Sequence, residues 1–242
     1  EKAPVIAQIY AEHFAFYHGG GLIAKAALRI IEETKVPVCL HLDHSNSYER
    51  INYAINLGFH SVMYDGSSLP LEENIALAQK VVGQAHSKGI YTEVELGRIG
   101  RISGGELDVL YDDCTSVEEA VRLVEESGAD SLAPAIGTAH GIYKTTPKLN
   151  FERLAEIKDA VNVPLVLHGG SGIPEDMIRK SIELGIAKIN VGTELKYKWS
   201  STVKEGLESG IKEPIRLGED AKTAVKEVAK TKIRLFGSNG RA

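Results

Sequence analysis

Short apolar runs alternate with longer amphipathic segments along the whole chain. The apolar runs are four to seven residues long, and turn-forming or charged residues bound them. Continuous apolar runs of this length are typical of strands that are buried on both faces of a parallel sheet. The predicted strands are residues 5–9, 36–42, 60–64, 91–96, 130–136, 164–167 and 187–191.

The segments between these runs have the apolar spacing of helices that cover a sheet with one face. Ser45-Asn46-Ser47 and Asn150 offer side chains that cap helix starts. Glycine closes a helix at low cost because it adopts the left-handed conformation, and four glycines stand at predicted helix ends: Gly58, Gly89, Gly128 and Gly185. The predicted helices are residues 22–33, 48–57, 71–88, 116–126, 151–161, 174–184, 194–207 and 219–236.

This alternation predicts an α/β fold with a wholly parallel sheet and right-handed crossovers. Seven near-regular units favour a (β/α)8 TIM barrel, and an open doubly wound sheet is the alternative. No linker divides the chain, so we expect a single domain over residues 1–242. Since such a barrel has eight strands, we expect its first βα unit to be absent from the given sequence. The glycine-rich residues 97–113 predict a loop over the site.

Composition narrows the classes of function. The chain is 43% hydrophobic and 25% charged, which is ordinary for a globular protein. A net charge of -5 argues against nucleic acid as a partner. No apolar run approaches the roughly 20 residues that span a bilayer, so we expect no membrane partner. Two cysteines make no disulfide framework, and we expect a cytoplasmic protein.

Three histidines follow predicted strands: His44, His140 and His168. The carboxyl ends of barrel strands form the face where ligands bind, so these imidazoles are expected to converge. Three imidazoles would suit a catalytic zinc with one coordination position left open. The alternative interpretation is a set of polar residues at strand ends.

Carboxylates stand at the same ends of the strands. Asp43 precedes His44, and a turn at the strand end would let both face one pocket as metal ligand and proton shuttle. Asp65 and Glu95 are placed to join a metal site or to orient its ligands, although each alone also fits a structural role.

Glycine-rich turns after the last two predicted strands indicate a phosphate site. His168-Gly169-Gly170-Ser171-Gly172 precedes a helix that is expected to begin near Pro174, and Asn190-Val191-Gly192-Thr193 ends the next strand. Backbone N–H groups and helix N-termini in such turns favour anions, although a tight turn without a ligand is the alternative. Lys188 would permit a Schiff base instead of a metal.

Taken together, these stretches resemble the class II, metal-dependent ketose-bisphosphate aldolases, which include fructose-bisphosphate and tagatose-bisphosphate aldolases. Six motifs occur in the family's order. They are residues 40–44, 61–67, 94–97, 135–141, 164–174 and 188–193.

The resemblance implies a role for each group. The zinc ligands would be His44, His140 and His168, and Asp43 would exchange the proton of the hydroxyl at the cleaved bond. Asp65 and Glu95 would border an alternative position for a divalent metal, and a monovalent cation would lie near the phosphate. The residues implied to hold the phosphorylated three-carbon half are Gly141, Gly169, Gly170, Ser171, Asn190, Val191, Gly192 and Thr193.

One departure concerns the loop acid that handles the proton on the three-carbon half in this family. Ungapped alignment puts Ser103 at that position, and Glu106 is the candidate replacement. The leading hypothesis is a cytoplasmic, homo-oligomeric (dimeric or tetrameric) zinc aldolase of glycolysis or related carbohydrate metabolism, with a phosphorylated ketose as partner. The alternatives are another metal-dependent enzyme such as a hydrolase, a Schiff-base aldolase, and a non-catalytic sugar-phosphate-binding relative. Fructose and tagatose bisphosphate both remain open as substrates.

Overall fold

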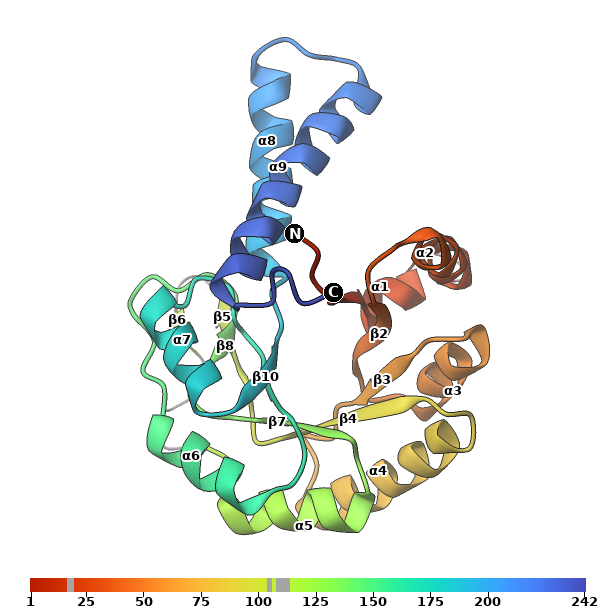
Figure 1. Cartoon of the computed structure of the whole chain (residues 1–242), viewed down its shortest axis with the longest axis vertical. Helices are drawn as coiled ribbons and strands as arrows, with labels where there is room; N and C mark the ends of the chain where they lie inside the picture. The colour runs from red at the N-terminus through yellow and green to blue at the C-terminus, as the bar shows by residue number, and fades with distance from the viewer. Residues whose placement is uncertain (17–19, 104–105, 108–113) are drawn as a thin grey trace.

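The computed structural model describes residues 1–16, 20–103, 106–107 and 114–242. Seven parallel strands form one curled sheet in the order β1-β2-β3-β4-β7-β9-β10, with helices around its outer face (Figure 1). This arrangement confirms the predicted α/β barrel architecture. The strands are β1 (Val5–Tyr10), β2 (Val38–Ser45), β3 (Ser61–Tyr64), β4 (Tyr91–Leu96), β7 (Ser131–Pro134), β9 (Leu165–Leu167) and β10 (Ile186–Ile189).

The helices follow the predicted order, with two differences. A short helix, α1, was not predicted, and α9 begins five residues earlier than predicted. Pro214 occupies the first turn of α9, where its missing N–H costs nothing, and the Glu213 side chain accepts a hydrogen bond from Ile215 N. The helices are α1 (Ala11–Phe16), α2 (Gly21–Glu33), α3 (Tyr48–Leu57), α4 (Leu71–His86), α5 (Val117–Ser127), α6 (Phe151–Ala160), α7 (Glu175–Glu183), α8 (Thr193–Glu208) and α9 (Pro214–Leu235).

Local sequence signals fix several element boundaries as expected. Ser47 and Asn150 cap α3 and α6 by accepting hydrogen bonds from Arg50 N and Arg153 N. The four glycines predicted at helix ends all have positive φ angles, the region that other residues avoid. These short-range devices stop each helix at the point where the next strand must begin.

A second, small sheet joins two strands from the segment predicted as a loop to a third strand outside it. Its order is β6-β5-β8, from β5 (Gly100–Ser103), β6 (Glu106–Leu107) and β8 (Ala139–His140). The β5–β6 pair is antiparallel, so the prediction of wholly parallel pairing holds for the large sheet alone. Because β5 pairs in parallel with β8, this small sheet connects the 97–113 segment directly to the strand that carries His140.

The hydrophobic core lies between the sheet and its helices. Leu40 and Leu42 on β2, Val62 on β3 and Val94 on β4 are fully buried there against helix residues. Side chains alternate along a strand, so the intervening residues point to the other face of the curled sheet. Along β2 and β4 these are His41, Asp43, Glu93 and Glu95, which gives the interior of the barrel a strongly polar character.

The curled sheet has a seam between β1 and β10, the two strands at the ends of its order. A groove of about 990 Å³ follows this seam, and β1, β10 and the C-terminal part of α9 line it. Val5 and Ile6 on β1 are 37% and 44% exposed. The seam therefore carries apolar surface on an edge strand.

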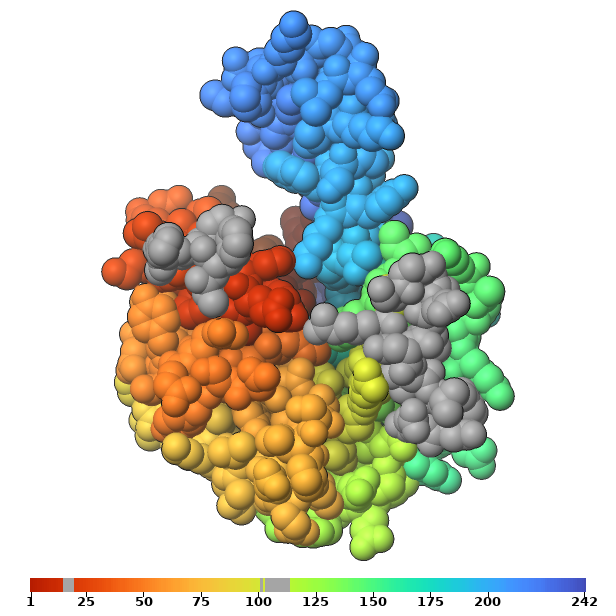
Figure 2. Space-filling view, turned by 180° about the vertical axis from the view of Figure 1, so that it is seen from behind, coloured from red at the N-terminus to blue at the C-terminus, as the bar shows by residue number. Residues whose placement is uncertain are grey.

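Helices α8 and α9 pack together and project away from the barrel body as an arm (Figures 1 and 2). None of the helices in the described segments combines the length and apolar character that crossing a lipid bilayer requires. The arm joins the barrel directly after β10, so the N-terminus of α8 lies beside the ends of the strands.

Candidate functional site

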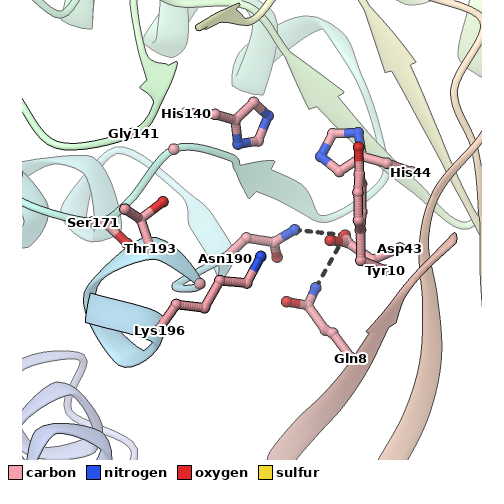
Figure 3. A pocket seen from close by; sticks show the side chains of 12 residues that line it. Gln8, Tyr10, Asp43, His44, His140, Gly141, Ser171, Asn190, Thr193 and Lys196 are labelled. Atoms are coloured by element: carbon pink, nitrogen blue, oxygen red, sulfur yellow. Dashed lines mark hydrogen bonds between the residues drawn. The ribbon is translucent and has the colours of Figure 1, made fainter. Parts of the chain in front are cut away.

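A cavity of about 210 Å³ opens where the sheet strands end, and side chains from β1, β2, β8 and the turns after β9 and β10 surround it (Figure 3). This is the carboxyl-terminal face, where barrel enzymes place their ligands. Its lining residues are Gln8, Tyr10, Asp43, His44, His140, Gly141, Gly169, Ser171, Asn190, Gly192, Thr193 and Lys196.

The backbone of β2 explains how two consecutive side chains reach this cavity. The pairing of β2 with β3 shifts register between Leu42 and Ser45, and His44 has a φ angle of +50°. That left-handed conformation is costly for a residue other than glycine and is typical of functional sites. The irregularity turns both Asp43 and His44 toward the cavity, as the sequence predicted.

The three predicted histidines converge. The ring centroid of His44 lies 4.9 Å from that of His140 and 4.5 Å from that of His168. Each ring offers a nitrogen, and these three nitrogens all lie within 4.8 Å of one another. His44 Nε2 and His168 Nδ1 are 2.8 Å apart. Imidazole nitrogens that converge in this way fit a transition-metal ion, for which neutral histidine is a common ligand.

The carboxylates of Asp65 and Glu95 approach the same imidazoles. Asp65 Oδ2 is 3.0 Å from His44 Nδ1, and Glu95 Oε2 is 3.6 Å from it. Glu95 Oε2 is buried and has no hydrogen-bond partner among the described residues. His44, Asp65 and Glu95 thus form a second group that fits a metal ion, next to the three histidines.

The pKa values of His44, Asp65 and Glu95 are all shifted by burial and by their mutual contacts. Burial alone would lower the pKa of His44, but its hydrogen bond to Asp65 and the nearby Asp43 and Glu95 raise that pKa to about 9. Burial would raise the pKa of Asp65, but hydrogen bonds from His44 and Ser67 lower it to about 2. Burial and the charge of Asp65 raise the pKa of Glu95 well above its usual value.

Asp43 is held by two amide side chains that come from opposite sides of the seam. Asn190 Nδ2 donates to Asp43 Oδ1 at 3.0 Å, and Gln8 Nε2 donates to the same oxygen at 3.4 Å (Figure 3). Both contacts reach one oxygen, so the carboxylate is oriented by fixed donors at the cavity wall. A carboxylate held in this way is suited to exchange a proton with a bound hydroxyl.

The glycine-rich turns lie on the other side of the cavity. Gly141, Gly169, Ser171, Gly192 and Thr193 line it. The Ser171 hydroxyl accepts a hydrogen bond from Glu194 N, which joins the turn after β9 to the first turn of α8. The N-cap residue of α8 is Gly192, which has no side chain of its own to cap the helix.

Two of the predicted phosphate-site residues, Gly170 and Val191, are not among the residues that line this cavity. Gly170 donates its N–H to Asn190 O, so this amide joins the turns after β9 and β10. Val191 lines the groove along the seam. The predicted helix near Pro174 begins at Glu175, but it is the N-terminus of α8, rather than that of α7, that contributes to the cavity lining.

Three cavity residues escaped the sequence analysis: Gln8, Tyr10 and Lys196. Gln8 and Tyr10 share one face of β1 because they are two residues apart, and this alternation was the available signal. Lys196 lies in the first turn of α8, and its Nζ is 5.8 Å from the centre of the Tyr10 ring. Lys196 therefore adds a cationic side chain to this side of the cavity.

Lys188 contacts a carboxylate. Its Nζ lies 2.7 Å from Glu93 Oε2 in the interior of the barrel. A Schiff-base lysine needs an unprotonated amine that is open to the substrate carbonyl. The contact with Glu93 occupies this amine in the barrel interior and so argues against that mechanism.

The candidate loop acid is described only in part. The backbone of Glu106 pairs with Ser103 in the small sheet, one strand further from β8 than β5 is. The side chain of Glu106 lies outside the described part of the chain. The small sheet therefore connects the backbone of Glu106, through β5, to the strand that carries His140. The catalytic role of Glu106 stays a prediction.

Comparison with known proteins identifies close relatives. A family model described as fructose-bisphosphate aldolase class-II matches residues 1–241. A protein named fructose-bisphosphate aldolase from Staphylococcus aureus is 42% identical over 248 residues, which cover 100% of this chain and 86% of that protein.

Solved structures show the same fold. The crystal structure of the YdjI aldolase from Escherichia coli K12 matches with a TM-score of 0.88 and 39% identity, over 100% of this chain and 84% of that one. A putative fructose-1,6-biphosphate aldolase from Coccidioides immitis matches with a TM-score of 0.88 and 31% identity, over 99% and 84% of the two chains.

Proposed function

Because the chain belongs to the class II fructose-bisphosphate aldolases, a family of lyases, we propose that it reversibly cleaves a ketose 1,6-bisphosphate. The products would be dihydroxyacetone phosphate and glyceraldehyde 3-phosphate. One observation supports this most directly: three imidazole nitrogens within 4.8 Å of one another share a cavity with an oriented carboxylate, Asp43. Fructose and tagatose bisphosphate, which differ only in configuration at one carbon, are both candidate substrates.

We propose zinc as the metal, held by His44, His140 and His168. Three histidine nitrogens suit zinc and leave one position open for the substrate. When bound, zinc would supply Lewis-acid stabilisation of the negative charge that cleavage leaves on the three-carbon half. The unpartnered Glu95 Oε2 supports an alternative divalent position beside Asp65. A monovalent cation near the phosphate is the remaining part of the cofactor proposal.

Asp43 is the proposed acid and base for the hydroxyl at the cleaved bond. Removal of that proton as the carbon–carbon bond breaks, and its return in the reverse direction, requires a carboxylate at hydrogen-bond distance from the substrate. The donors from Gln8 and Asn190 orient Asp43 toward the cavity before substrate binds. Such orientation lowers the cost of reaching the reactive geometry.

The phosphate of the three-carbon half would bind at the turns after β9 and β10. Gly169, Ser171 and Thr193 line that side of the cavity, and the first turn of α8, which follows the N-cap Gly192, begins there. Lys196 would add charge one turn further along. For the second proton transfer, on the three-carbon half, the proposed group is Glu106, the acid of the displaced Gly104-Gly105-Glu106 run.

The cellular setting is also part of the proposal. Neither Cys39 nor Cys114 forms a disulfide, which supports a reducing compartment such as the cytoplasm, and the activity would serve glycolysis or related carbohydrate metabolism. The projecting α8–α9 arm exposes large apolar side chains, which supports a homodimer or homotetramer. These side chains are Tyr197, Trp199, Leu207 and Ile215.

The deciding experiment is an aldol-cleavage assay with fructose 1,6-bisphosphate and with tagatose 1,6-bisphosphate. Each is measured with and without EDTA, followed by addition of zinc. We expect cleavage that EDTA abolishes and zinc restores, and the ratio of kcat/KM values identifies the substrate. Binding of dihydroxyacetone phosphate without turnover of either sugar would instead favour a non-catalytic sugar-phosphate-binding relative.

Asp43→Asn tests the proton transfer separately from the metal. We expect kcat to fall by about 10² to 10⁴-fold, the usual contribution of a general acid or base, while bound zinc stays stoichiometric. His44→Ala is the comparison variant, in which zinc content and activity should fall together. Wild-type kcat in Asp43→Asn would assign the proton transfer to another group.

A further inference from the structure

A buried cluster of charged side chains, Glu93 and Lys188, contacts His168 in the interior of the barrel. The proposed reaction does not use this cluster. Glu93 on β4 is 2% exposed, and its two carboxylate oxygens have separate partners. Oε1 lies 2.9 Å from His168 Nε2, and Oε2 lies 2.7 Å from Lys188 Nζ. Burying a carboxylate this deeply costs desolvation free energy unless the group is paired. We therefore ask what role these two contacts of Glu93 have.

The geometry of the His168 ring indicates that role. Its two nitrogens face different neighbours: Nε2 faces Glu93, and Nδ1 faces His44 Nε2 at 2.8 Å, on the side of the proposed metal. A neutral imidazole carries one N–H, and a carboxylate paired with lysine only accepts hydrogen bonds. The hydrogen must therefore sit on Nε2, which leaves the lone pair of Nδ1 pointing toward the other histidines.

A second polar group near Nε2 does not change this assignment. Asn190 Nδ2 lies 3.2 Å from His168 Nε2, but the same amide donates to Asp43 Oδ1 at 3.0 Å. Turning the amide over would place its oxygen against the Asp43 carboxylate. The amide nitrogen therefore stays with Asp43, and Glu93 remains the acceptor for His168.

We infer that Glu93 is a positioning residue for the metal centre, fixing His168 as the Nε2–H tautomer so that Nδ1 is presented to the metal, and that Lys188 holds Glu93 in place. This inference rests on the proposed metal site. Carboxylates that receive the second N–H of a ligating histidine orient its ring and raise its basicity, and their loss typically weakens metal binding by about 10- to 100-fold.

The cluster also connects distant parts of the barrel. Glu93 lies on β4, His168 directly follows β9 and Lys188 lies on β10. His41 on β2 completes the surroundings, with Nε2 3.9 Å from Glu93 Oε2 and Nδ1 hydrogen-bonded to Ser61 Oγ at 2.8 Å. The position of one metal ligand is thus set by side chains from three other strands.

Three variants separate the contributions. Glu93→Gln keeps an acceptor oxygen but loses the charge, Glu93→Leu removes both, and Lys188→Met leaves the carboxylate without its cation. Glu156→Gln is the matched control, since Glu156 is an exposed glutamate that pairs with Arg153 on α6. Each apo-protein is titrated with Zn²⁺ against a chromophoric chelator, and its fold is checked by circular dichroism.

We expect Zn²⁺ affinity to fall about 10- to 100-fold in Glu93→Leu, less in Glu93→Gln and Lys188→Met, and not at all in Glu156→Gln. The visible absorption spectrum of the Co²⁺-loaded protein should change in Glu93→Leu, because the ligand field changes when His168 is released. Folded Glu93 variants with wild-type affinity and an unchanged Co²⁺ spectrum would overturn the inference.

A measurement on the wild-type apo-protein keeps the inference testable even if a variant fails to fold. Long-range ¹H–¹⁵N correlation spectra of histidine-labelled protein report which ring nitrogen carries the hydrogen. We expect the Nε2–H tautomer for His168, and an Nδ1–H tautomer would contradict the role of Glu93. This readout needs neither metal nor turnover, so it fails independently of the proposed aldolase activity.

Discussion

At the residue scale, the site depends on side chains whose positions are fixed by a few unusual backbone or pairing arrangements. The left-handed conformation of His44 turns Asp43 and His44 toward one cavity. Glu93 contacts the ring nitrogen of His168 that points away from the other histidines. The histidines and Asp43 were predictable because each stands beside a strand end. Lys196 and Glu93 were not, because their roles depend on partners far away in the sequence.

A residue outside the site shows how pairing sets stability. Asp130 Oδ2 accepts hydrogen bonds from Thr92 N at 2.7 Å and Thr92 Oγ1 at 2.9 Å, and it pairs with His86 at 2.9 Å. Burial would raise the pKa of Asp130, but these partners lower it below its ordinary value of 3.8. A lowered pKa contributes stability above pH 3.8 that is lost as the pH falls through the folded-state value.

We therefore expect Asp130→Asn to lower the free energy of unfolding at pH 7 by about 1 to 3 kcal/mol, as for a lost charged hydrogen-bond partner. Urea denaturation at several pH values measures this. The difference from wild type should shrink as the pH falls below 3.8 toward the lowered folded-state pKa, where the folded wild-type carboxyl becomes protonated. Asp159→Asn, at an exposed position, is the control, and an equal loss there would refute the assignment.

At the scale of elements, segments with an apolar run or a helical apolar spacing were predictable, and segments without either were not. Strands β4 and β3 and helix α3 follow directly from apolar runs and capping residues. Strands β5, β6 and β8 lie outside the apolar runs, and they form because they pair with one another. The start of α9 was missed because Pro214 begins the helix rather than interrupting it.

Two glycines allow a test of close packing between elements. Gly169 has a φ angle of +69°, and an added Cβ would lie 2.4 Å from Ala139 O on β8. Gly169→Ala should thus force β8 away from the turn after β9. Gly83, inside α4, has no atom within 4 Å of an added Cβ.

We expect Gly169→Ala to lower both the melting temperature and zinc affinity, since β8 carries His140 and His168 precedes the turn. Gly83→Ala should instead stabilise the protein by about 0.5 to 1 kcal/mol, the difference in helix propensity. Calorimetry and chelator competition measure the two effects. Similar behaviour of both variants would show that the β8 contact has no special role.

At the scale of the whole molecule, the α8–α9 arm extends from a barrel whose other helices lie against the sheet (Figures 1 and 2). Trp199 is 43% exposed and Ile215 is 76% exposed on this arm. The sequence predicted its helices, but their projection away from the body is a tertiary property that no local pattern encodes.

We expect light scattering to give a mass of two or four times the chain mass of 26.2 kDa. The double variant Trp199→Glu, Ile215→Glu should shift the protein toward the monomer, because charges replace apolar contacts. Ile30→Glu, on α2, is a control with 65% exposure outside the arm. A monomeric wild-type protein, or an arm variant of unchanged mass, would contradict this prediction.

The hydrogen bonds that Asp43 accepts from Gln8 and Asn190 affect how readily the edge strand β1 opens locally. They link the two edges of the seam, because Gln8 lies on β1 and Asn190 directly follows β10. Edge strands open more readily than central ones, which exposes their amides to solvent exchange. Amide hydrogen exchange in β1 should thus be faster in Asp43→Ala than in the wild type, while exchange in β3 should stay the same. The proposed proton-transfer group would then also serve as a clasp that keeps the two edges of the barrel wall together.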